Sequence, residues 1–368
     1  MAAVGQHNFP KGRVMVPRCL VTAVCILVIW SFSAVAASPP SHLDRKNLPN
    51  GCSSCHVGFD FSNGGGAARC LGCHGSTNPR FAGWASKIKT SNVAADFAKT
   101  YRHPSLDLRS NHNSREILPE REQNKPRHAD CVDCHNPHNL SHDNPYAGLK
   151  GKRTGNFNAT ITKEYELCYL CHAESANLPL KSTNKRTDFS LNNMSFHPVE
   201  GEGRNTAVVS LLRPYRERKL TAGDINIISC SDCHASDDPK SPRGPHGSRY
   251  QSILVENYNT GDNIPESSFT YAICYRCHKR TSILGNESFP FHSRHITGER
   301  NFKRGGTSCH TCHSSHGSVE NRYLLRFNRE FVSESSSGKL KFVEKGVNNF
   351  HGECWLTCHG VDHNPKTY

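Results

Sequence analysis

Helical spacing of hydrophobic residues is confined to three short stretches of this chain. Residues 92–101 show it and are followed by Pro104, which predicts a helix that ends before the proline. Segments 162–173 and 268–279 show it again, and each contains the sequence Cys-x-x-Cys-His. The pattern therefore predicts short helices, two of which present that sequence.

Strand spacing is equally scarce. A strand is expected at 250–258, and 323–332 with 340–343 are expected to form a hairpin around the Ser-Ser-Ser-Gly sequence of 335–338. Most of the remaining chain is rich in Gly, Pro, Asn and Ser, which indicates loops. The predicted fold class is mostly irregular, with short α-helices and few β-strands.

The Cys-x-x-Cys-His pattern recurs along the whole chain. Seven copies have this spacing, and an eighth carries one additional residue between its cysteines. Together they account for sixteen of the 18 cysteines; the other two, Cys19 and Cys25, lie near the N-terminus. The eight copies are Cys52/Cys55/His56, Cys70/Cys73/His74, Cys131/Cys134/His135, Cys168/Cys171/His172, Cys230/Cys233/His234, Cys274/Cys277/His278, Cys309/Cys312/His313 and Cys354/Cys358/His359.

The spacing has a chemical reason. Two thiols three positions apart reach the two vinyl groups of one haem, and the next histidine reaches its iron, so the pattern is typical of c-type haem attachment. A zinc site or a short disulfide is the alternative, but zinc needs four ligands and a disulfide has no use for the histidine. We therefore expect eight covalent haem c groups in an α-leaning array. The longer Cys354–Cys358 spacing is the least typical.

A second histidine on each iron is expected because histidines are in surplus. Of 23 histidines, eight lie in the motifs and His7 lies in the N-terminal segment, which leaves fourteen. Position relative to the motifs ranks these, with Met194 a minor alternative. His295, His310, His351 and His363 are held in reserve, and His112 and His142 are expected in solvated loops. The expected second ligands are His42, His103, His128, His138, His197, His246, His292 and His316.

The first 37 residues have the features of a secretory signal peptide. Lys11, Arg13 and Arg18 precede an apolar run from Leu20 to Phe32, and small residues follow it. An uncleaved membrane anchor is the alternative, although the run is short for a membrane span. An exported protein, periplasmic or at the outer surface, is expected, with the membrane reached only through this segment or a partner complex.

Composition indicates that the polypeptide alone has little to bury. Hydrophobic residues make up 35% of the chain, and the mean hydropathy is −0.62. The haems are therefore expected to supply the missing core, and a chain without them to remain largely unfolded. The formal net charge of +13 is offset by haem propionates, so nucleic-acid binding is not expected.

The motifs fall into pairs, which predicts tandem units. Tyr-x-x-Cys-Tyr occurs at both 165–169 and 271–275, as expected of a repeated array. The expected division is a signal peptide of 1–37 followed by four haem-pair units at 38–120, 121–200, 201–300 and 301–368.

These motifs resemble those of multihaem c-type cytochromes of metal-reducing and other anaerobic bacteria, over roughly 42–363. The resemblance implies electron transfer without catalysis, in anaerobic or extracellular respiration, with redox proteins or extracellular acceptors as partners. It also includes cytochromes that polymerise into filaments, for which a terminal histidine such as His42 or His363 would be the donor to the next subunit. The alternatives are an oxidoreductase acting on nitrite, hydroxylamine or a sulfur oxyanion at one open iron, and a purely structural filament or adhesin.

Overall fold

The computed structural model describes most of the chain beyond its first 41 residues. The described residues are 42–45, 47–48, 50–56, 66–75, 91–106, 129–141, 143–153, 156–174, 182–205, 207–298 and 306–368. All of them belong to one compact unit, Ser38–Tyr368. The expected signal peptide lies outside the described residues, as do His112, His128 and His142.

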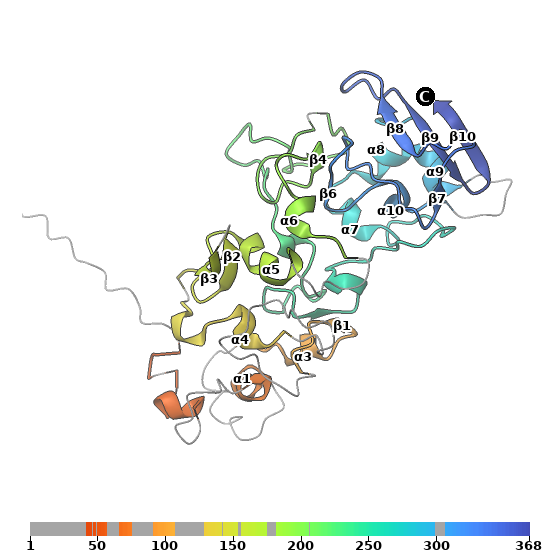
Figure 1. Ribbon diagram of the computed structural model, residues 1–368. Helices are drawn as coiled ribbons and strands as arrows, with labels where there is room; N and C mark the ends of the chain where they lie inside the picture. Colours follow the sequence, from red (N-terminus) through yellow and green to blue (C-terminus); the bar gives the residue numbers. More distant parts are fainter. Residues whose placement is uncertain are drawn as a thin grey trace, which may run out of the picture. The chain divides into compact units, whose positions relative to one another are not determined.

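Helices in the described residues are short, and loops separate them (Figure 1). Two of the α-helices have nine residues and end on a motif histidine. The α-helices are α1 (Gly66–His74), α3 (Ala94–Phe97), α4 (Cys131–Cys134), α5 (Glu164–His172), α6 (Lys185–Asp188), α7 (Ala272–Tyr275), α8 (Arg280–Leu284), α9 (His292–Thr297) and α10 (Cys309–Cys312). The 3-10 helices are η1 (Gly51–Ser54), η3 (Pro137–Asn139), η4 (Cys230–Asp232) and η5 (Gln251–Ile253).

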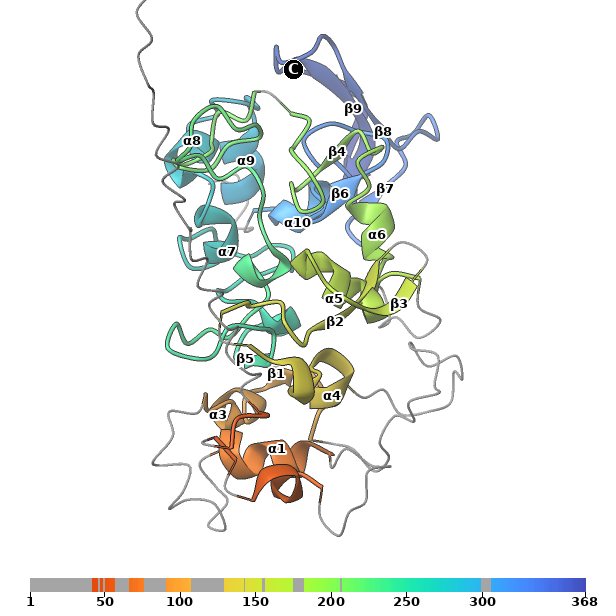
Figure 2. The ribbon, with the colours of Figure 1, turned by 90° about the vertical axis from the view of Figure 1, so that its left-hand side faces the viewer.

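The described strands form three small two-stranded sheets and one larger sheet. The small sheets pair β1 (Tyr101–Arg102) with β5 (Gly247–Ser248), β2 (Lys150–Arg153) with β3 (Asn156–Thr160), and β4 (Ser195–Phe196) with β6 (Gly317–Ser318). In the larger sheet, β9 (Gly352–Cys358) pairs antiparallel with β7 (Val332–Ser333), β8 (Lys341–Glu344) and β10 (Val361–Thr367). Figure 2 shows this C-terminal sheet from a second direction.

The helices expected from the sequence are present but shorter than their patterns. The one expected at 162–173 is α5, and those expected at 92–101 and 268–279 shrink to α3 and α7. The turn expected at 335–338 is also present, with the Gly338 N–H donating to the Ser335 carbonyl over 2.8 Å. Its flanking strands, β7 and β8, pair with β9 instead of with each other.

The strand expected at 250–258 is wrong. The chain forms η5 there, and Ser252 and Ile253 take the left-handed conformation, with φ of 60° and 54°. This turn brings the Ser252 carbonyl to the ring Nδ1 of His234 at 2.8 Å. A long-range contact therefore overrides the local β pattern of these residues.

The apolar core formed by the polypeptide is small. One cluster of buried residues joins Tyr169, Ala173, Phe189 and Val199. Many other buried side chains are polar, including Asp96, Asp130 and Glu166. Such a core is modest for a compact unit of this length, as expected if another group completes it.

Two of the small sheets are copies of one arrangement. In each, a strand ends directly before a histidine: β1 before His103 and β4 before His197. The partner strand begins directly after His246 or His316. Nδ1 of His103 lies 2.7 Å from the carbonyl oxygen of residue 245, which precedes His246. Nδ1 of His197 lies 2.7 Å from that of residue 315, which precedes His316. The fold therefore holds histidines together that are more than 100 residues apart in sequence.

Glycine begins the partner strand in both copies because the backbones approach closely. A Cβ at Gly317 would lie 1.8 Å from the Asp188 carbonyl oxygen, and one at Gly247 would lie 2.0 Å from that of Asp96. Gly317→Ala is therefore expected to force the strands apart and to lower the free energy of unfolding by about 1–3 kcal/mol. Denaturation of the haem-loaded protein, followed by Soret circular dichroism, measures this.

Gly223→Ala is the matched control, since a Cβ there meets no atom within 4 Å. Equal stability of the two variants would contradict the close approach at Gly317.

Candidate haem-binding sites

Seven of the eight motifs fold as a helical turn. In five of them the backbone N–H of the motif histidine donates to the carbonyl of the first cysteine, over 2.8–3.0 Å. In the other two, His74 and His172 end helices α1 and α5. One helical turn places both thiols and the imidazole within reach of a single porphyrin, which is the geometry that c-type attachment needs.

Short polar side chains fix several of these turns. Asp133 accepts a hydrogen bond from the Asp130 N–H over 2.6 Å, and Asp232 accepts one from the Ser229 N–H over 2.7 Å. Each carboxylate lies between the two motif cysteines in sequence and caps the start of its turn. The sequence of the motif therefore carries its own helix-start signal in these two copies.

The motif cysteines are all free thiols, and those of consecutive motifs lie together. First cysteines meet through thiol hydrogen bonds, and second cysteines meet through electrostatic interaction. Burial, followed by the neighbouring thiol, raises the pKa of Cys134 and of Cys233 to about 12. The neighbouring groups along the chain are Cys55 with Cys70 and Cys73, Cys70 with Cys131, Cys134 with Cys171, Cys168 with Cys230, Cys233 with Cys277, Cys274 with Cys309, and Cys312 with Cys354 and Cys358.

This order makes the motifs one continuous series. Each described motif interacts with the next one in sequence, and from the second motif to the seventh a thiol hydrogen bond between first cysteines alternates with an electrostatic interaction between second cysteines. Groups attached at these thiols would therefore follow each other in sequence order.

Seven motif histidines each face a second histidine. The ring centres are 6.0–6.5 Å apart. A metal–imidazole bond is about 2.0–2.1 Å long, so two imidazoles on opposite sides of one iron have ring centres roughly 6 Å apart. The spacing fits an iron in each pair. The pairs are His56–His138, His74–His42, His135–His246, His172–His103, His234–His316, His278–His197 and His313–His292.

The second histidines follow a rule along the chain. For the first, third and fifth motifs the second histidine comes just after the motif two positions later. For the second, fourth and sixth motifs it comes from the segment before the preceding motif. Six of the seven pairs therefore join histidines of different expected haem-pair units, and His42 with His74 lies within one unit.

Backbone carbonyls orient several of these rings. The Nδ1 atoms of His74, His234 and His313 lie 2.8 Å from the carbonyl oxygens of residues 91, 252 and 323. Nδ1 of His278 lies 2.9 Å from the Ser210 hydroxyl. A proton held on Nδ1 in this way leaves the Nε2 lone pair for a metal.

Burial keeps these imidazoles neutral. Burial, reinforced by the neighbouring histidine, lowers the pKa of His135, His172 and His278 to about 4 and that of His292 to about 3. Neutral imidazole is the form that binds metal, so the rings need not release a proton at neutral pH.

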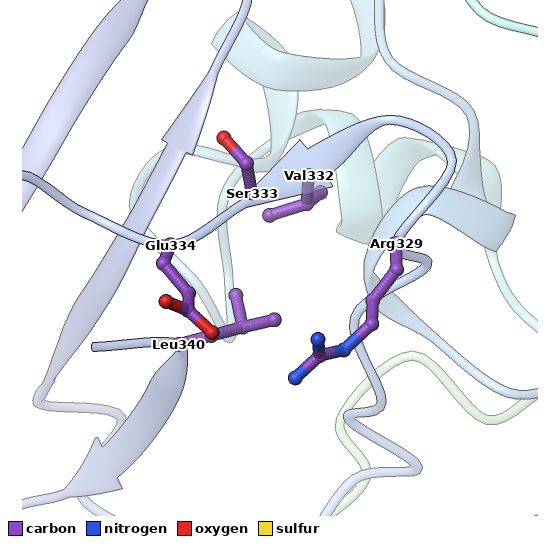
Figure 3. A pocket seen from close by; sticks show the side chains of 5 residues that line it. All are labelled: Arg329, Val332, Ser333, Glu334 and Leu340. Atoms are coloured by element: carbon purple, nitrogen blue, oxygen red, sulfur yellow. The ribbon is translucent and has the colours of Figure 1, made fainter. Parts of the chain in front are cut away.

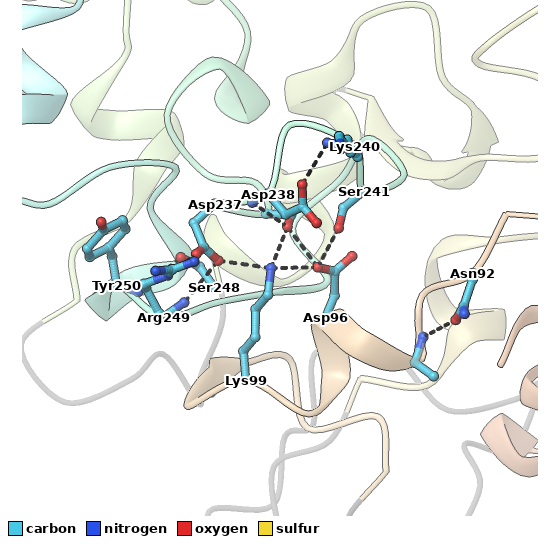
Figure 4. A network of polar contacts seen from close by, with 12 residues as sticks. Asn92, Asp96, Lys99, Asp237, Asp238, Lys240, Ser241, Ser248, Arg249 and Tyr250 are labelled. Atoms are coloured by element: carbon cyan, nitrogen blue, oxygen red, sulfur yellow. Dashed lines mark hydrogen bonds and ion pairs between the residues drawn. The ribbon is translucent and has the colours of Figure 1, made fainter. Parts of the chain in front are cut away.

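A polar network supports one of the pairs (Figure 4). Lys99 Nζ lies 2.8 Å from Asp96 and 2.9 Å from Asp237, whose side chains are 0% and 1% exposed. Burial opposes ionisation, but the bonds from Lys99 and Arg249 lower the pKa of Asp237 to about 2. The Phe97 ring, next to Asp96, packs edge-on against His246 at 5.7 Å.

The same arrangement recurs in the second copy. Asp188 contacts Lys185 at 3.1 Å and Arg326 at 3.3 Å, and Phe189 packs against His316 at 5.3 Å. Sequence reasoning missed this support. The shared Asp-Phe dipeptide upstream of His103 and His197 is the signal that could have found it.

The structure locates most of the histidines that the sequence proposed as second ligands or held in reserve. Seven of the eight expected second ligands face a motif histidine, and His128 lies outside the described residues. His310 packs edge-on against Tyr258, and His351 Nδ1 lies 3.2 Å from the Tyr368 carbonyl. His359, in the eighth motif, contacts Asp262, while the reserve residues His295 and His363 face each other at 6.5 Å.

A pocket of about 380 Å³ opens beside β7 (Figure 3). Arg329, Val332, Ser333, Glu334 and Leu340 line it. It contains none of the motif residues or paired histidines.

Comparison with known proteins gives one family match. Residues 151–323, slightly less than half of the chain, match the family described as outer membrane cytochrome MtrC/MtrF-like, domains II/IV. The match spans the fourth to seventh motifs. No curated protein and no solved structure matches significantly.

The motifs and this match together define a multihaem c-type cytochrome with covalently bound haem c, of the kind that passes electrons to redox partners and extracellular acceptors. The protein is an exported one, at the periplasmic or extracellular outer surface. Among the described helices, none is long and apolar enough to cross a membrane.

Lys99 is expected to hold the network of Figure 4 together. Lys99→Met leaves two buried carboxylates without their shared cation, so the free energy of unfolding should fall by about 3 kcal/mol. Adding Asp237→Asn should recover part of the loss, because one uncompensated charge is then removed. Denaturant midpoints measure both variants.

Lys240→Met serves as the control, because Lys240 is exposed. The structural role of Lys99 would be refuted if its substitution cost no more than that of Lys240.

Proposed function

We propose that this protein is an octahaem electron-transfer cytochrome whose haems form one series in sequence order. The observation that carries the proposal is the set of seven histidine pairs, each with ring centres 6.0–6.5 Å apart. In each motif the two thiols would hold one haem by adding across its vinyl groups, which forms two thioethers with no leaving group. When bound, each haem iron supplies reversible one-electron oxidation and reduction.

The residues of the chain hold and protect these sites. Each of the seven histidine pairs would hold a haem iron from both sides, which would leave no position open to a substrate and favours transfer over catalysis. Two nitrogen ligands also favour the ferric state more than a histidine–methionine pair does, so low potentials are expected. Carbonyls on Nδ1 fix five of these rings, and this limits ligand movement when the charge of the iron changes.

Neighbouring motifs supply the continuity that a carrier requires. The alternating contacts between consecutive cysteines keep adjacent attachment points together from the first motif to the eighth. We therefore propose a single linear path for electrons in anaerobic, extracellular respiration, in place of a branched cluster.

Self-association into filaments has less support. His42 and His363, the residues expected to ligate a neighbouring subunit, face His74 and His295 of the same chain. This favours ligand sets that are complete within one chain, and a single chain is the form we propose.

The ferric spectrum of the intact protein tests the proposal. We expect a mass increase of eight haems, entirely low-spin iron, and no binding of cyanide, nitrite or, after reduction, carbon monoxide. A high-spin fraction that binds nitrite would instead favour the oxidoreductase.

Removing one second histidine should open one iron. His197→Ala is expected to convert one of eight haems to high-spin and to raise carbon monoxide binding from about zero to about one per chain, because His278 loses the ring that faces it. His310→Ala is the matched control, since His310 faces no other histidine among the described residues. Unchanged low-spin iron in His197→Ala would contradict the assigned pair.

A further inference from the structure

The eighth motif differs from the others in its backbone. Cys354 and Cys358 lie on strand β9, not on a helical turn. Alternate residues of a strand share a face, so both cysteines lie on one face together with Leu356. Leu356 is buried, and the thiol of Cys312 interacts with both cysteines. This face is therefore the inner one, directed at the seventh motif.

The other face of β9 carries Trp355, whose ring lies against two lysines. Lys339 Nζ lies 4.0 Å and Lys341 Nζ 5.7 Å from the centre of the Trp355 ring. Trp355 is adjacent to Cys354, so the alternation of the strand places the cysteines opposite these lysines.

His363 lies on the inner face, between the two cysteines. In the β9–β10 pair its Cα is directly opposite that of Leu356, which is midway between Cys354 and Cys358. Directly opposed residues of an antiparallel pair project to the same face. The strand register thus places this histidine on the same face of the sheet as both thiols.

The imidazole of His359 is engaged by a carboxylate, although it is near enough to His295 to interact with it electrostatically. His359 lies in the bend between β9 and β10 with φ of 52°, and its Nε2 contacts a carboxylate oxygen of Asp262. In the rings of His74, His234 and His313 it is Nδ1 that is engaged, which leaves Nε2 free. The contact with Asp262 therefore occupies the nitrogen that a motif histidine uses.

His295 completes a pair with His363. Their ring centres are 6.5 Å apart, within the range of the other seven pairs. Nδ1 of His295 lies 2.8 Å from the Phe291 carbonyl, which leaves its Nε2 for a metal.

Aromatic rings line the space beside this pair. Phe289 stacks on His295 at 5.7 Å and meets Tyr368 at 4.7 Å, and Tyr368 stacks on Phe342 at 6.4 Å. Phe342 is paired in register with Cys354. A row of rings thus connects one histidine of the pair with a motif cysteine, as an apolar macrocycle would require.

The order of second histidines along the chain also indicates His295 as a ligand at the eighth motif. Second histidines of the second, fourth and sixth motifs come from the segment before the preceding motif. For the eighth motif that segment is 279–308, which contains His292 and His295. His292 faces His313, so His295 is the one left.

We propose that the iron of the haem attached at Cys354 and Cys358 is ligated by His295 and His363, with His359 held by Asp262 away from the iron. This rests on the proposed function for the presence of the haem, and it assigns an axial ligand from outside the motif.

The test compares His363→Ala, His295→Ala and the control His351→Ala in the haem-loaded protein. His351 is exposed and near the same sheet. For His363→Ala and His295→Ala we expect eight haems by intact mass, one of eight irons high-spin, and about one carbon monoxide bound per reduced chain, with added imidazole restoring the low-spin spectrum. His351→Ala should match the unaltered protein.

A second variant separates ligation from a structural role. His363→Met keeps a side chain that can ligate, so it should hold eight low-spin haems, show the absorption band of iron–methionine ligation, and raise one of eight reduction potentials. Eight low-spin haems in His363→Ala, or loss of one haem from both His363 variants, would overturn the proposal.

These outcomes are distinct from failure of the proposed function. High-spin iron or ligand binding in the unaltered protein would count against the electron carrier. A fully low-spin parent with an unchanged His363→Ala would remove only the assignment of His295 and His363.

Discussion

The separation of two imidazole rings, a little over 6 Å, is the constraint on which the rest of this structure depends. Two imidazoles gain little from each other at this distance, so the surrounding chain has to position them. It does so with backbone carbonyls: His103 is fixed by residue 245 and His197 by residue 315. Sheets of two residues per strand are enough, because their task is to bring these carbonyls into place.

This constraint explains why the buried interior is polar. Asp96 and Asp188 are buried beside Lys99 and Lys185, and each precedes a phenylalanine that packs on a paired histidine. Charged groups at such positions add little net stability compared with apolar residues, but they define one geometry. A chain with few hydrophobic residues thus obtains order from hydrogen bonds, and leaves apolar burial to the group that the thiols attach.

Much of the chemistry could be predicted from the sequence, and much of the backbone could not. The motif spacing identifies the thiols and histidines because that chemistry is local. The second histidines could be ranked by their position, and seven of those ranked highest face a motif histidine. Which histidine faces which depends on contacts between residues far apart in sequence, such as His135 and His246, and no local pattern encodes it. The strand expected at 250–258 failed for the same reason, since the conformation of Ser252 is set by His234.

The alternation of ligands also bears on how the array is built. Each expected haem-pair unit contains a motif histidine that faces a histidine of another unit, so no unit has all its ligands within itself. Loss of one unit would remove ligands from the adjacent ones, so cooperative folding of the described region is expected instead of independent repeats. Helix α9 departs from the order that the other second histidines follow along the chain. It supplies His292 to the seventh motif and His295 toward His363, so one six-residue helix serves both of the last two positions in the series. A helix that spaces two histidines three residues apart places them on one face, and this accounts for how two neighbouring sites can be served without a further stretch of chain.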